Sequence, residues 1–191
     1  MTVEAQRAYN GIVLLVSYLQ RIYVTEKIYH HLNEPHDPAR LEEVKELFDD
    51  TLAMVPIFEQ TKFLADTQVD KLRRVTAQME SYMTTYFKNS PSFEDKLALV
   101  GSSIYAEQNI NNGIIRLGQV FNVEINKDFQ KRIKFYEERT KMIDIIVSAL
   151  KNKKPLEEQA EKLIESWYDN VMKNKELILN DMKKIGQLIG F

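Results

Sequence analysis

All three histidines of the chain, His30, His31 and His36, lie in one short segment near the end of the first predicted helix. Glu26 and His30 are four residues apart, so a helix would place both on one face, where His36 or Asp37 could complete a metal site. Consecutive histidines point about 100° apart on a helix. A histidine near a helix C-terminus is also favoured by the helix dipole alone. Glu26, His30 and His36 are therefore a candidate metal site, with the dipole as the competing explanation.

A second polar cluster lies inside an otherwise apolar segment. Amides such as Asn109 and Asn112 are poor helix formers, and residues 111–113 (Asn-Asn-Gly) tolerate positive φ. One interpretation is a solvated turn. The other is a polar layer between helices that binds a small polar ligand, with Arg116 as a partner for an anion and Tyr105 in the wall of the pocket.

The sequence offers little for catalysis. Residues 42–46 and 157–161 both have the form Glu-Glu-x-x-Glu, which could hold Mg²⁺ through carboxylate oxygens. Both runs open predicted helices, where acidic residues complement the dipole, and neither has a second acidic motif at a useful distance. The chain has no cysteine, and it lacks a Gly-x-Ser-x-Gly motif and a glycine-rich phosphate loop. We therefore expect no enzymatic activity and no cofactor.

Composition narrows the class of partner. The formal net charge is −2, from 26 basic and 28 acidic residues, so the chain has no global attraction to nucleic acid or to anionic lipid. The N-terminal segment lacks the pattern of a signal peptide, and no apolar run approaches the roughly 20 residues that span a bilayer. We expect a cytoplasmic chain with no nucleic-acid partner and no membrane segment, unless the sequence is a piece of a membrane protein.

The helices that must position the candidate site residues are predicted from the prolines and glycines that separate them. Most of the five prolines and six glycines fall between long segments that carry apolar residues at three- and four-residue spacing. The predicted helices are residues 3–33, 38–88 with breaks at Pro56 and near Asp66, 92–110, 126–151 and 155–188. The sequence thus predicts one all-α domain over residues 1–191, an elongated up-down bundle of about four to six helices with a core like that of a four-helix bundle.

Three local features stay open at this stage. Gly11 permits a close helix crossing near the start of the first helix. Residues 111–113 either end a helix or lie within it. Residues 114–125 partly alternate like a strand, but a single strand cannot satisfy its backbone, so we expect a helix or an irregular connector there.

Three functions are compatible with this sequence. The first is a non-enzymatic interaction module, an adaptor, assembly or regulatory protein that contacts a protein partner or a second copy of itself as a homodimer. The alternative is a sensory four-helix bundle. There, a small ligand between the helices shifts the equilibrium between two packing arrangements of the helices, and a terminal helix transmits the change. A metal- or nucleotide-handling all-α protein is the third.

Overall fold

The computed structural model describes residues 2–32 and 37–191, and every regular element in these ranges is a helix. The predicted all-α class is therefore confirmed. The helices are α1 (Val3–Leu32), α2 (Pro38–Leu52), α3 (Met54–Thr61), α4 (Asp66–Thr84), α5 (Phe93–Phe121), α6 (Asp128–Lys151), α7 (Glu158–Lys173) and α8 (Lys175–Ile189).

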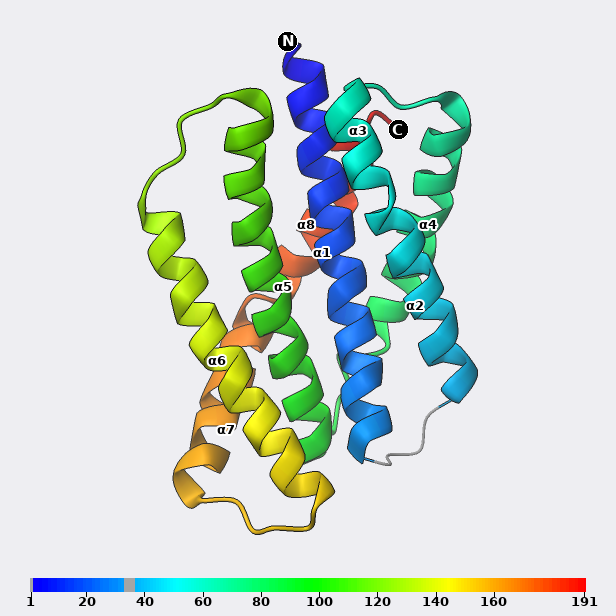
Figure 1. Cartoon of the computed structure of the whole chain (residues 1–191). Coiled ribbons are helices and arrows are strands. Elements are labelled where there is room, and N and C mark those ends of the chain that lie inside the picture. Colours follow the sequence, from blue (N-terminus) through cyan, green and yellow to red (C-terminus); the bar gives the residue numbers. More distant parts are fainter. Residues whose placement is uncertain (1, 33–36) are drawn as a thin grey trace.

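The helices run up and down along one long axis (Figure 1). From the N-terminus, α1 runs down, α2 and α3 run up, α4 runs down, α5 runs up, α6 runs down, and α7 and α8 return to the starting end. Because α2 continues into α3 and α7 into α8, the eight described helices make six passes. The expectation of four to six helices was therefore too low as a helix count, since two of the passes are interrupted.

The two interruptions fall at different kinds of residue, Ala53 and Asn174. The break between α2 and α3 falls at Ala53, so that Pro56 lies in the first turn of α3, where a missing N–H leaves no intrahelical bond unmade. The prediction of the last helix was wrong in two respects. The observed helix begins at Glu158 rather than at Pro155, and it is divided at Asn174 into α7 and α8. The Asn174 side chain donates to the carbonyl oxygen of Asn170 at 2.9 Å, a bond that Asn111 also makes to Glu107 inside the unbroken α5, so the bond does not by itself explain the break.

The predicted caps of two helices are present. Ser92 Oγ accepts from Asp95 N at 3.1 Å, and Asp95 Oδ2 accepts from Ser92 N at 2.9 Å, which forms a reciprocal capping box at the start of α5. Asp37 Oδ1 accepts from Ala39 N at 3.0 Å at the start of α2. These caps fix where α2 and α5 begin.

The α5 helix continues through residues 111–113 and ends at Phe121, with Asn122 in the left-handed region at φ 52°. The buried side chain of Asn111 donates to the carbonyl oxygen of Glu107 at 2.7 Å, so the amide is satisfied inside the helix. Gly113 allows α1 to approach, because a Cβ atom there would lie 2.2 Å from Val13 Cγ1. Residues after Asn122 form the irregular connector, so no strand forms in this described segment.

The core is centred on α1 and α5, which lie side by side (Figure 1). The apolar residues of α1 predicted to form its stripe are buried, among them Ile12, Leu15, Leu19 and Ile22. At Gly11 a Cβ atom would lie 2.6 Å from Ile189 Cγ1, so α8 crosses α1 closely at the predicted position. Within the described ranges, no helix combines the length and the apolar character needed to cross a membrane.

Candidate functional site

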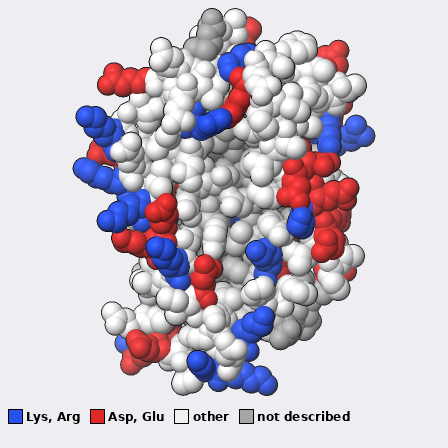
Figure 2. Space-filling view, in the orientation of Figure 1, with Lys and Arg blue, Asp and Glu red and all other residues white. Residues whose placement is uncertain are grey.

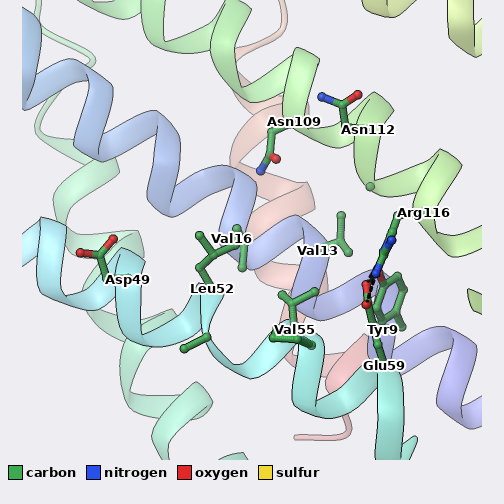
Figure 3. A pocket seen from close by; sticks show the side chains of 13 residues that line it. Tyr9, Val13, Val16, Asp49, Leu52, Val55, Glu59, Asn109, Asn112 and Arg116 are labelled. Atoms are coloured by element: carbon green, nitrogen blue, oxygen red, sulfur yellow. Dashed lines mark hydrogen bonds and ion pairs between the residues drawn. The ribbon is translucent and has the colours of Figure 1, made fainter.

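Three of the four predicted ligand-binding residues share one groove. Asn109, Asn112 and Arg116 lie along a cavity of about 660 Å³ between α5, α1 and the α2–α3 pass (Figure 3). Most of its other lining residues are apolar, including Val13, Val16, Leu52, Val55 and Pro56. Figure 2 shows this face hollowed between the helices, with acidic side chains gathered on the side of α2.

Arg116, the predicted anion partner in this groove, already has an acidic partner in the protein. Arg116 donates from Nε and Nη2 to the two oxygens of Glu59, at 2.9 and 2.6 Å, and so joins α5 to α3 (Figure 3). Tyr9 OH also donates to Glu59, at 2.6 Å. The hydrogen bonds from Arg116 hold the pKa of Glu59 below its usual range. Asn109 donates to Ser17 Oγ at 3.2 Å, so the groove presents few polar groups to a ligand.

Tyr105 does not join the other three residues. Its hydroxyl donates to Asp144 Oδ1 on α6 at 2.9 Å, and burial raises the pKa of Tyr105 to about 12. It lines a different cavity, of about 230 Å³, together with His31. Residues 105 and 116 stand about 16 Å apart along a helix, which is too far for one small groove.

The metal candidates have other neighbours in the described residues. The Glu26 carboxylate is buried, accepts a short hydrogen bond from Tyr86 OH, and lies 3.1 Å from Arg40 Nε. The described residues contain no group of three or more side chains that could hold a metal ion. His36 lies outside them, so the complete Glu26, His30 and His36 site stays a prediction, while Glu26 is held by Arg40 and Tyr86.

Sequence reasoning missed a second cavity, of about 680 Å³, between α1, α5, α6 and the α7–α8 pass. Arg21, from the middle of α1, lines it and is only 5 % exposed. Its Nη2 donates to Ser103 Oγ at 2.7 Å, and its Nε has no hydrogen-bond partner. Throughout the described ranges, no carboxylate forms an ion pair with Arg21. We call this space the Arg21 cavity.

The wall around Arg21 is partly aromatic. The Arg21 guanidinium lies 5.7 Å from the centre of the Tyr18 ring, and burial raises the pKa of Tyr18 to about 12. Burial also lowers the pKa of Arg21 below its ordinary value. The guanidinium of Arg139 lies 3.4 Å from the centre of the Phe135 ring and 4.9 Å from that of Trp167. Aromatic rings on this wall hold the second arginine in place by cation–π contact.

The α7–α8 break forms another wall of the Arg21 cavity. Asn170 comes from the end of α7, Asn174 is the break itself, and Ile178 and Asp181 come from α8. Tyr18 OH donates to the carbonyl oxygen of Ile178 at 3.5 Å, at the limit of a hydrogen bond. The cavity therefore touches both helices of the interrupted pass and the central α1.

One signal in the sequence could have identified Arg21. It is the sole charged residue between Arg7 and Glu26, in a segment so apolar that every side of the helix must be covered. A helix that is apolar all round is buried, and an arginine within it is then buried as well. Ser103, Arg139 and Trp167 come from three other helices, and only the tertiary packing brings them to Arg21.

No protein-family model matches this chain, and neither the curated proteins nor the solved structures compared with it give a match. Among the cavities described above, the Arg21 cavity carries the strongest chemical feature, a buried arginine that forms no ion pair with a carboxylate of the described residues.

Proposed function

We propose that this chain is a ligand-sensing helical bundle that binds a small carboxylate-bearing molecule in the Arg21 cavity. The observation that carries the proposal is the state of Arg21, which is 5 % exposed and has one neutral hydroxyl, Ser103 Oγ, as its hydrogen-bond partner among the described residues. The sensory alternative predicted from the sequence is thereby favoured over the interaction module, although the site lies at different residues.

The physical reason is the cost of an unpaired buried charge. Burying a polar group without a partner costs about 1 to 3 kcal/mol on protein scales, and a charged group costs more. A carboxylate in the cavity would offset this cost, because a guanidinium binds two oxygens with its planar fork and does so more strongly where water is excluded. The mixture of aromatic walls and a few polar groups is typical of small-molecule sites.

The position of the cavity supports a sensory role. Its lining includes Asn174, where α7 ends and α8 begins, so a ligand would contact both sides of the interruption. α8 then crosses α1 closely at Gly11. A ligand that favours one angle between α7 and α8 would shift the population of α8 positions, provided its affinity differs between the two arrangements.

Thermal unfolding tests the proposal. The wild type and the variant Arg21→Met would be screened against acetate, pyruvate, benzoate, 3-phenylpropionate and 4-methylpentanoate, together with the twenty amino acids. We expect at least one of these carboxylates to raise the wild-type melting temperature, since a ligand that binds only the folded state stabilises it. The same compound should leave Arg21→Met unshifted, and Arg7→Met, an exposed change on the same helix, should respond like the wild type. Equal shifts in all three proteins, or none in the wild type, would contradict the proposal.

The interaction module has separate support on the outer face of α6. Met142 and Ile145 are 41 % and 69 % exposed, and they lie three residues apart on this helix. Exposed apolar side chains in a row are typical of contact surfaces. Light scattering over a range of protein concentrations tests this second candidate. A mass that rises in the wild type and stays monomeric in Ile145→Glu would support it, and a constant monomer mass in both would contradict self-association.

A further inference from the structure

The charges that line the Arg21 cavity are balanced. Arg21 and Arg139 contribute two positive charges, and Glu107 and Asp181 contribute two negative charges. A ligand that carries one positive and one negative group matches the lining.

Glu107 is placed to meet a cation close to Arg21. It follows Ser103 by four residues on α5, so the two side chains lie on the same face, one turn apart. The Glu107 carboxylate is near enough to Arg21 to favour its charged form, yet no ion pair joins them. No cation within the described ranges forms an ion pair with Glu107 either.

The buried Arg21 and the solvent-exposed Glu107 therefore line one cavity without forming an ion pair with each other. Ser103, which accepts the hydrogen bond from Arg21, and Glu107 lie one helical turn apart on α5, about 6 Å along its axis. By comparison, Asp181 already has a cationic neighbour, since its Oδ1 lies 3.4 Å from Lys184 Nζ. Glu107 is thus the better partner for a positive group of the ligand.

We infer that the ligand is an α-amino acid with an apolar or aromatic side chain. Its carboxylate binds Arg21, its ammonium group faces Glu107, and its side chain lies against Tyr136 and Trp167. This inference rests on the proposed function, because it assigns a class of ligand to the same cavity. The volume of about 680 Å³ is large enough for a side chain of any of the twenty amino acids.

Isothermal titration with matched compounds tests the inference. L-Leucine would be compared with 4-methylpentanoate, which lacks the ammonium group, and with 3-methylbutylamine, which lacks the carboxylate. L-Phenylalanine would be compared with 3-phenylpropionate and 2-phenylethylamine in the same way, and any other amino acid that shifts the melting temperature would be titrated too. We expect the best amino acid to bind at least about tenfold more tightly than either of its analogues, since each lost charge-assisted hydrogen bond costs more than 1.4 kcal/mol.

The variant Glu107→Gln isolates the ammonium contact. It should weaken amino-acid binding about tenfold and leave the carboxylate analogue unchanged, whereas Glu161→Gln, an exposed change on α7 outside the cavity, should alter neither. If the carboxylate analogue binds the wild type as tightly as the amino acid, the inference is wrong and the proposed function stands. If no carboxylate and no amino acid binds, both are wrong. An amino acid whose affinity does not change in Glu107→Gln also overturns the inference.

Discussion

Arg21 Nη2 donates to Ser103 Oγ at 2.7 Å, which joins the centres of α1 and α5 through a charged group and a neutral one. The Ser103 hydroxyl itself donates to the carbonyl oxygen of Leu99 at 2.8 Å, so it can accept from Arg21 but cannot neutralise it. The two central helices therefore meet at a charge that forms no ion pair with any carboxylate of the described residues.

Arg21→Met should stabilise the free protein, because it removes a buried charge and fills most of the same volume with an apolar chain. We expect the free energy of unfolding to rise by about 1 to 2 kcal/mol, and the melting temperature by about 3 to 6 °C for a chain of this size. Urea unfolding followed by circular dichroism measures this, with the exposed change Arg7→Met as a neutral control. A loss of several kcal/mol in Arg21→Met would show that Arg21 supports the fold rather than a ligand.

Gly11→Ala should destabilise the protein even though alanine is the better helix former. The new methyl group would lie 2.6 Å from Ile189 Cγ1 and 3.2 Å from Ile189 N, so α8 would have to move away from α1. Overpacking of this kind costs about 1 to 3 kcal/mol, against a gain of up to about 1 kcal/mol in helix propensity. Thermal unfolding of Gly11→Ala and of the double variant with Ile189→Ala measures the cost. A double variant that recovers none of the loss caused by Gly11→Ala would contradict the close crossing.

Arg40→Met should be strongly destabilising, in contrast to Arg21→Met. It would leave the buried Glu26 carboxylate, which lies 3.1 Å from Arg40 Nε, with Tyr86 as its neutral partner. Breaking a buried ion pair by removing one member costs about 3 to 5 kcal/mol, and the value should fall at the low end because Arg40 is partly exposed. Denaturant unfolding measures the loss. Removing both charges in Arg40→Met with Glu26→Gln should recover part of it, and no recovery would contradict the coupling.

Stability should fall in acid through Asp95. Burial opposes its charged form, but hydrogen bonds from Lys88 at 2.6 Å and Tyr29 at 2.5 Å lower the pKa of Asp95 to about 2. A pKa lowered by folding gives stability that is complete above the unfolded-state pKa of about 3.9 and is lost as the pH falls towards 2. We expect a contribution of about 1 kcal/mol, since solvent screens the half-exposed Lys88.

Urea unfolding between pH 6 and pH 2.5 measures this contribution, with Asp95→Asn as the comparison. The stability difference between the wild type and Asp95→Asn should shrink as the pH falls below 4. A difference that stays constant over this range would show that Asp95 does not gain its low pKa from the folded structure.

The sequence predicted the helices better than it predicted the site. The apolar spacing in α1, the cap at Ser92 and the close crossing at Gly11 depend on neighbours along the chain or on one glycine, so they could be found locally. The sequence does not reveal the break at Asn174, because asparagine also occurs in unbroken helices, and Asn111 in α5 makes the same bond to a carbonyl four residues earlier.

The candidate site was harder to predict because its residues come from distant helices. Arg116 had the residue type expected to bind an anion, but its guanidinium already binds the carboxylate of Glu59 on α3. Arg21 was overlooked within an apolar segment, although its isolation there was visible. Whether an arginine has an acidic partner is decided by tertiary packing, and no spacing along one helix reveals it.

Isothermal titration of the best-binding carboxylate against the wild type, Arg21→Met and Arg21→Lys tests the central claim most directly. Lysine keeps the charge but lacks the planar fork. The account predicts saturable binding to the wild type, binding weakened at least about tenfold in Arg21→Lys, and no binding to Arg21→Met in a variant that remains folded. Undiminished binding to a folded Arg21→Met would contradict it.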